Sequence, residues 1–213
     1  MILYHFSTSP FARRVRLVLA HKGCSAELRD PRVNPELTPE LQRLSPMHTV
    51  PVLVDEQRVI VDSTAIVHYL ERKLPEPAIF PQGVAGTFAF ELAALADSAI
   101  GIIADVGARY YALHEHAVFP RVREVMVGRA QRALDTMADR VLARGNGIPL
   151  CGEQWGWADI VVYTTVAWLE GLPVRAATQP APKQMVSLGW KLPAALSEWA
   201  DQHRSRPDVL ALG

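Results

Sequence analysis

The feature that most constrains the fold is a helix start placed directly after a short β-prone segment. Residues 1–6 favour a strand, and Ser9-Pro10 then opens a helical pattern that stops at Gly23. Serine favours the N-cap and proline the first helical position, because the first N–H groups of a helix lack intrahelical partners. Such a helix start carries about half a positive charge. It therefore stabilises an anion, and a thiolate is an anion.

The first half of the chain alternates short strands with helices. Residues 26–30 favour a second strand, residues 38–44 a short helix, and residues 52–54 and 59–61 the two strands of a hairpin. A helix from Asp62-Ser63 to Leu74 follows. Strand, helix and strand imply parallel pairing through a right-handed crossover, while the hairpin adds antiparallel strands. The pattern predicts an α/β domain with a mixed four-stranded sheet.

The second half is predicted to be entirely helical. Apolar residues recur at steps of three and four over residues 84–112 and 119–144, which predicts two long helices. Residues 171–190 contain three prolines and are predicted to form a loop, and residues 192–203 a last helix. The predicted organisation is a domain at 1–75, a Pro-rich linker at 76–83 and an all-helical domain at 84–213.

Asp159 is predicted to cap a helix within this second domain. It lies three residues after Gly156, which stands where a capping hydroxyl is usual, and it can reach back to the backbone of that residue. Glycine is an acceptable N-cap, although a poorer one than serine or threonine. We expect Asp159 to serve folding rather than catalysis.

Composition argues against several classes of protein. Lysine plus arginine and aspartate plus glutamate both number 22, so the basic excess of a nucleic-acid binder is absent. We expect no membrane partner, because the pattern predicts no apolar run of the length of a span. Cys24 and Cys151 lie far apart and outside any Cys/His cluster, so we expect a soluble cytoplasmic protein without disulfides or metal.

Three motifs of the first half together resemble the thioredoxin-like domain of the glutathione transferases. They match in order and spacing, and they are Ser9 to Arg16, Pro46 to Pro51, and Asp62-Ser63. The serine-rich start is similar to that of zeta-type members. The resemblance implies a thioredoxin-like domain followed by an all-α domain, a cis Val50–Pro51 bond and a homodimer. Ser45 and Asp62 depart from the Asn and Glu that many members carry at these positions.

The resemblance also implies a role for each matching residue. Ser9 matches the catalytic serine, whose hydroxyl binds the sulfur of glutathione. Val50 matches the residue whose backbone pairs with the cysteinyl part. Asp62 and Ser63 match the pair that holds the γ-glutamyl end, and His48 falls near the glycyl carboxylate.

The residues themselves leave alternatives to Ser9. Ser7 and Thr8 are hydroxyls in the same turn, and Tyr4 is a further candidate although it lies several residues before the helix. Lowering a thiol pKa of 8.5 by about two units needs roughly 2.7 kcal/mol. One hydroxyl donor together with a helix N-terminus supplies about that much. A serine at position 9 argues against thiol–disulfide exchange, which needs a protein sulfur.

The expected activity is a detoxifying glutathione transferase, with glutathione as co-substrate and a small apolar electrophile as partner. Two alternatives remain, namely a glutathione-dependent isomerase of the maleylacetoacetate type and a non-catalytic glutathione- or protein-binding member. By resemblance, the region of Arg109, Tyr110, Tyr111, His114 and His116 lines the electrophile pocket. The pattern alone equally favours a solvated helix end with one tyrosine that points inward. The two histidines are two residues apart, so one helix face cannot present both to a metal.

Overall fold

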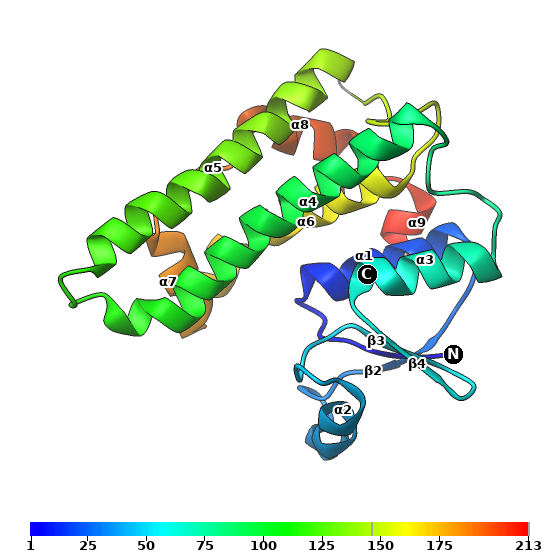
Figure 1. The fold of residues 1–213 in the computed structure, drawn as a ribbon, viewed down its shortest axis with the longest axis horizontal. Coiled ribbons are helices and arrows are strands. Elements are labelled where there is room, and N and C mark those ends of the chain that lie inside the picture. The colour runs from blue at the N-terminus through cyan, green and yellow to red at the C-terminus, as the bar shows by residue number, and fades with distance from the viewer. Residues whose placement is uncertain (146, 213) are drawn as a thin grey trace. The chain divides into compact units, whose positions relative to one another are not determined.

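The computed structural model describes residues 1–145 and 147–212, which form two compact units (Figure 1). Unit 1 comprises residues 1–79 together with the described residues from Arg204 onward, and unit 2 comprises residues 80–203.

Unit 1 is built on a mixed four-stranded sheet in the order β2-β1-β3-β4. The strands are β1 Ile2–Tyr4, β2 Glu27–Arg29, β3 Val52–Asp55 and β4 Arg58–Val61. β1 is parallel to β2, whereas β3 is antiparallel to both β1 and β4. The predicted α/β thioredoxin-like sheet is therefore confirmed.

Helices cover both faces of this sheet. α1 Pro10–His21 and α3 Ser63–Lys73 lie on one side, and α2 Thr38–Leu44 lies on the other, preceded by the 3-10 turn η1 Pro35–Leu37 (Figure 1). α1 ends where predicted, because Gly23 adopts a φ of +61°. The Gly23 N–H donates to Ala20 O and the Cys24 N–H to Leu19 O, the Schellman arrangement that satisfies the last carbonyls.

The C-terminal helix α9 Pro207–Leu210 packs against α1. Asp208 lies 2.9 Å from His21 Nδ1 and accepts two hydrogen bonds from Arg206, each of 3.1 Å. These contacts place the chain end in unit 1, whereas residues 84–213 were predicted to form one domain. The difference arises because a four-residue helix has too little periodicity to show which core it joins.

The regular elements of unit 2 are all helices within its described residues, joined by turns and loops. Its elements are α4 Val84–Asp105, the π-helical turn η2 Val106–Tyr110, the 3-10 turn η3 Tyr111–Leu113, α5 Phe119–Arg144, α6 Trp157–Ala176, α7 Pro180–Ser187 and α8 Ala194–His203. The predicted helix over 84–112 is thus regular only to Asp105. A Cβ on Gly107 would lie 2.6 Å from Met185 Cγ, so glycine allows α7 to approach this π-helical turn closely.

The run Val84–Leu113 is long and apolar enough to cross a membrane by length and composition, since a window of 18 residues within it has a mean hydropathy of 1.6. This corrects the expectation that no apolar run reaches that length. Core helices of soluble proteins meet the same criterion, so the composition by itself is weak evidence for a span. α4 packs against α5 and α6, and its Ala96, Ile100 and Ile103 are fully or almost fully buried.

The predicted loop at 171–190 is wrong. α6 continues to Ala176 with Pro173 in its last turn, and Pro180 and Pro182 lie in the first turn of α7. Prolines at a helix start remove N–H groups that have no partner there, so they do not break the helix. Burial of Leu169 and Leu172 offsets the hydrogen bond that Pro173 removes near the end of α6.

Candidate functional site

The strand pairing brings the three sequence motifs to one edge of the sheet. Tyr4 lies opposite Val52, and Val52 lies opposite Val61, so these residues form one row. Ser9 follows the end of β1, Val50 precedes the start of β3, and Asp62 follows the end of β4. Because β1 and β4 both end where β3 begins, the starts of α1 and α3 meet the same edge.

Ser9 is the N-cap of α1 and is partly buried. Its Oγ accepts the Ala12 N–H at 3.2 Å, and its carbonyl accepts the Arg13 N–H at 3.0 Å. A hydroxyl that accepts in this way still has its own proton to donate. Within the described residues, neither the Ser9 hydroxyl proton nor the Phe11 N–H has an acceptor. Both donors are therefore available to an anion at this helix start.

The other hydroxyls considered for the sulfur have different surroundings. Thr8 Oγ1 accepts a hydrogen bond of 3.0 Å from Arg32, and the side chain of Ser7 is exposed. The Tyr4 hydroxyl accepts from Arg29 at 2.9 Å within a side chain that is only 1% exposed. Burial and then hydrogen bonding to Glu40 raise the pKa of Tyr4. Tyr4 packs with Leu41 of α2, so it is a core residue of the face opposite α1.

Val50 precedes a cis peptide bond to Pro51, as predicted. β3 begins only at Val52, and neither the N–H nor the carbonyl of Val50 is paired with another backbone group in the part of the chain that the structure describes. An extended peptide beside Val50 would find one donor and one acceptor, as an added strand does at a sheet edge.

Asp62 and Ser63 form the start of α3. Asp62 is exposed with a φ of +74°, and its Oδ1 accepts the N–H groups of Thr64 at 2.9 Å and Ala65 at 3.1 Å. Ser63 is 3% exposed, and among the described residues its N–H and hydroxyl make no hydrogen bond. The second carboxylate oxygen, Asp62 Oδ2, is also unused there. This helix start therefore offers the N–H and hydroxyl donors of Ser63 beside the Oδ2 acceptor of Asp62.

His48 lies in an exposed turn between α2 and β3 and has a φ of +53°. The turn is held by Ser45, whose carbonyl accepts the His48 N–H and whose Oγ accepts the Thr49 N–H, both at 3.0 Å. The serine that departs from the usual Asn thus has a structural role of its own. No side-chain hydrogen bond is formed by His48 within the described ranges.

Cations surround the loop that carries Ser9. Arg16 donates to Ser7 O at 3.3 Å, and burial, then Arg13, lower the pKa of its guanidinium. Burial and the charge of Arg16 lower the pKa of His5, so this histidine favours its neutral form. The Ser7 N–H donates to Asp30 at 3.0 Å, which ties the loop to the segment after β2. The excess positive charge favours anions here.

The candidate electrophile region lies at η2 and η3 of unit 2. Arg109 pairs with Asp105 at 3.2 Å and is exposed, while Tyr111 stacks on His114 at 5.0 Å and meets the edge of Phe119 at 5.9 Å. Tyr111 is thus the one inward tyrosine of the pattern-based prediction, since Tyr110 is 49% exposed. The described residues contain no group of three or more metal-ligating side chains.

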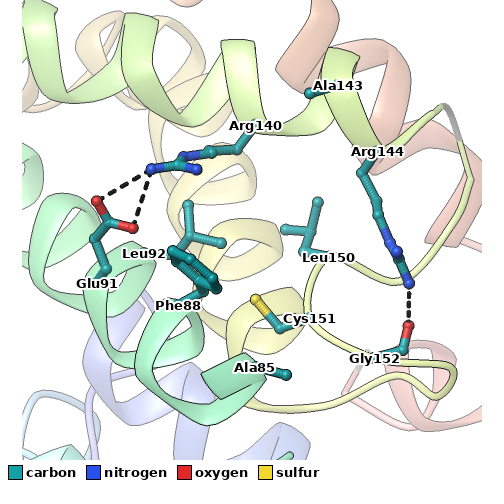
Figure 2. Close-up of a pocket in the computed structure, with 10 residues that line it drawn as sticks. All are labelled: Ala85, Phe88, Glu91, Leu92, Arg140, Ala143, Arg144, Leu150, Cys151 and Gly152. Carbon is teal, nitrogen blue, oxygen red and sulfur yellow. Dashed lines mark hydrogen bonds and ion pairs between the residues drawn. The ribbon is translucent and has the colours of Figure 1, made fainter.

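A pocket of about 290 Å³ lies within unit 2, between α4, α5 and residues 150–152, and Figure 2 shows residues that line it. Arg140 reaches across it to Glu91, with contacts of 3.2 and 3.3 Å, and Arg144 turns to the carbonyl of Gly152. Burial raises the pKa of the Cys151 thiol to about 11, so this sulfur is protonated at neutral pH. None of the predicted glutathione-binding residues lines this cavity.

Sequence reasoning missed two residues beside the Ser9 loop. Asp30 is buried and accepts the N–H groups of Ser7 and Arg32. Arg32 approaches the Ser9 loop through Thr8, across a gap of 24 residues in sequence. Only the run of alternating charges in Arg29-Asp30-Pro31-Arg32 marks this segment, and it carries no periodic signal.

Comparison with known protein families accounts for most of the chain. Residues 3–78 match the family described as glutathione S-transferase, N-terminal domain, and residues 103–202 match the one described as glutathione S-transferase, C-terminal domain. The two matches follow one another in the order of the two units.

Curated relatives match over 82 to 84 residues of this chain. Glutathione S-transferase 1 of Dianthus caryophyllus is 48% identical over 84 residues, covering 38% of each chain. Glutathione S-transferase Z1 of Arabidopsis thaliana is 40% identical over 82 residues, covering 38% of this chain and 37% of that protein. A stringent starvation protein A homolog of Pasteurella multocida is 37% identical over 83 residues, covering 38% of each. The chain thus spans little more than a third of the length of the curated relatives it matches.

Among solved structures, maleylacetoacetate isomerase of Methylobacterium extorquens, crystallised with malonate and glutathione, has a TM-score of 0.73. The match covers 100% of this chain and 95% of that one at 19% identity. At that identity the likeness shows a shared fold. This fold agrees with the prediction of a thioredoxin-like domain followed by an all-helical domain.

Proposed function

The chain belongs to the glutathione S-transferase family, and on that premise we propose that it binds glutathione, holds its thiolate and transfers it to a small electrophile. The observation that carries the proposal is the set of unused hydrogen-bonding groups at one sheet edge. These groups are the Ser9 hydroxyl proton, the Val50 backbone and the Ser63 N–H with Asp62 Oδ2.

The sulfur is assigned to Ser9. A free thiol with a pKa near 8.5 is only a few per cent ionised at neutral pH, and the thiolate is the nucleophile. The Ser9 hydroxyl donates its proton to the sulfur, while its oxygen still accepts the hydrogen bond from the Ala12 N–H. The positive end of α1 adds to this preference for the anion. Ser9 acts as a hydrogen-bond donor, because its hydroxyl keeps its proton at neutral pH and so provides no alkoxide that could act as a base.

The peptide part is assigned to Val50 and to the start of α3. The backbone of Val50 pairs with the cysteinyl residue in the manner of an added strand. The γ-glutamyl carboxylate accepts from Ser63, and Asp62 Oδ2 receives the α-ammonium group. His48, which is exposed, is assigned to the glycyl carboxylate.

The chemical step needs no group beyond the thiolate and the electrophile. With a chlorodinitroaromatic, the sulfur lone pair forms the C–S bond, the ring carries the charge, and chloride leaves with the C–Cl electrons. The gain over free glutathione comes from the larger thiolate fraction and from positioning of the two reactants.

Isomerisation of a maleyl-type acid is the second candidate, favoured by the structural likeness to a maleylacetoacetate isomerase. Addition of the thiolate to the cis double bond moves an electron pair onto the adjacent carbonyl. Rotation about the resulting single bond and loss of the thiolate then give the trans acid. Glutathione is regenerated, so it acts as a cofactor in this reaction.

Ser9→Ala tests the assignment. We expect kcat/KM with a chlorodinitroaromatic to fall about 100-fold, which corresponds to roughly 2.7 kcal/mol. Ser7→Ala is the matched control, because this exposed hydroxyl lies in the same turn, and it should leave kcat/KM within about twofold. Glutathione binding is measured by calorimetry in parallel. Binding of glutathione with no turnover of either substrate class would favour the non-catalytic alternative.

We also infer a cytoplasmic homodimer from the family resemblance. Light scattering should give about twice the chain mass of 23.5 kDa. A mass that stays at that of one chain over the working concentrations would contradict this inference.

A further inference from the structure

Arg32 offers a positive charge beside the Ser9 loop without an anion to balance it. Its side chain is exposed, its guanidinium lies 4.0 Å from the centroid of the Phe6 ring, and Nη1 donates to Thr8 Oγ1 at 3.0 Å. Within residues 1–145 and 147–212, no carboxylate oxygen comes within 4.0 Å of this guanidinium. The neighbouring Asp30 accepts the backbone N–H of Arg32, and not its side chain.

This arrangement differs from that of two other arginines of unit 1, which are paired with carboxylates. Arg29 pairs with Glu27 at 2.7 Å and Glu40 at 3.3 Å, and Arg206 forms a fork with Asp208. Arg32 is held instead by an aromatic ring and a neutral hydroxyl. A cation over a ring face is attracted to it and loses side-chain freedom, yet its charge remains uncompensated. Such a group is pre-organised for an anion that arrives from outside.

The strand order places Arg32 away from the groups assigned to glutathione. Along the shared sheet edge the order is Arg32 after β2, Ser9 after β1, Val50 before β3 and Asp62 after β4. The tripeptide assigned above runs from Ser9 toward β3 and β4. Arg32 lies on the other side of Ser9, where a molecule that approaches the sulfur does not overlap the tripeptide.

We propose that Arg32 binds a carboxylate of the second substrate and so makes the enzyme select electrophiles that carry an acid group. The proposal rests on the proposed function, because it takes the glutathione sulfur to lie at Ser9. A guanidinium presents two parallel N–H donors that match the two oxygens of a carboxylate, which a point charge does not. The Thr8 hydroxyl and the Phe6 ring act as positioning groups for this cation.

The test compares two ligands that differ by one carboxylate. S-benzylglutathione and S-(4-carboxybenzyl)glutathione are titrated by calorimetry into the wild type, Arg32→Gln and Arg32→Lys. We expect Arg32→Gln to weaken the carboxylated ligand about tenfold and to leave the neutral ligand unchanged. Arg32→Lys keeps the charge and loses the fork, so we expect a loss of about threefold.

Arg58→Gln is the matched control. Arg58 is also exposed, and it lies opposite Asp55 at the other end of the strands, so its loss should change neither affinity. Circular dichroism checks that each variant is folded. If Arg32→Gln does not fold, the affinities of Arg32→Lys for the two ligands test the proposal.

Each result leads to a distinct conclusion. Equal weakening of both ligands would place Arg32 on the tripeptide, and unchanged affinity for both would remove it from binding, so either result overturns the proposal. If the wild type binds neither conjugate, the proposed function itself fails. Selective loss of the carboxylated ligand supports both.

Discussion

Two helix starts in this molecule use an aspartate in opposite ways. At the start of α6 in unit 2, Asp159 is 1% exposed, its Oδ1 accepts the Leu150 N–H and its Oδ2 the Gly156 N–H, both at 2.9 Å. At the start of α3 in unit 1, Asp62 is exposed and accepts two N–H groups through Oδ1. Oδ2 of Asp62 accepts none from the described residues.

The difference separates folding from binding. A buried carboxylate with both oxygens occupied stabilises the local chain and has no capacity for a ligand. An exposed carboxylate with one oxygen unused, beside the unused donors of Ser63, still caps its helix and can also receive a charged group. The sequence places both residues at helix starts, and the resemblance assigns only Asp62 to binding. The structure adds that the two carboxylates differ in burial and in the number of engaged oxygens.

The largest expected effect is on stability at Asp159. Asp159→Ala leaves the N–H groups of Gly156 and Leu150 without their acceptor in a buried site, so we expect a loss of about 3 kcal/mol in the free energy of unfolding. Urea unfolding measures it. Glutathione affinity per folded molecule should not change, and a loss of affinity with intact stability would break the comparison.

Asp208 is a further carboxylate with both oxygens engaged in hydrogen bonds. Its replacement should lower the free energy of unfolding by less than that of Asp159, and the loss should depend on pH. Although burial raises it, the hydrogen bonds from His21 and Arg206 hold the pKa of Asp208 down at about 2. Because the folded pKa lies below the ordinary value, the stabilisation is complete above about pH 4 and disappears as the pH falls toward 2.

The expected loss is on the order of 2 kcal/mol. The urea midpoint of the wild type is compared with that of Asp208→Asn at about pH 5 and pH 2.5. The variant should be less stable than the wild type at the higher pH, and the difference should shrink to roughly a third at the lower, because the folded carboxylate is then partly protonated. An equal difference at both values would exclude this carboxylate as the source.

Asp62→Ala should have the smallest effect on stability and a distinct effect on binding. The helix loses an exposed cap, which costs about 1 kcal/mol. Glutathione affinity should fall about tenfold, since the α-ammonium loses its carboxylate. Asp62→Ser keeps a capping oxygen and removes the charge, so it should restore stability but not affinity. Calorimetry that finds affinity restored as well would contradict a separate binding role.

Much of unit 1 could be predicted from the sequence because its signals are local. Ser9-Pro10 sets the start of α1, Gly23 sets its end, and the run Val52–Asp55 pairs with Arg58–Val61 across a short turn. Each depends on residues within a few positions of one another, so no knowledge of distant contacts is needed.

The parts that could not be predicted depend on contacts distant in sequence. Proline signals at 171–190 suggested a loop, whereas Pro180 starts a helix that packs against η2, where Gly107 leaves room for Met185. Arg32 reaches Thr8 across the sheet edge, and nothing near it in sequence indicates this. The unused groups of Val50 and Ser63 are likewise properties of the pairing, and not of the residues.

The pKa of the glutathione thiol bound to the protein tests the central claim most directly. It is read from the ultraviolet absorbance of the thiolate across a pH titration, for the wild type and for Ser9→Ala. The account predicts a value about two units below the 8.5 of a free thiol in the wild type, and a return close to 8.5 in the variant. A thiol pKa that is the same in both proteins would contradict it.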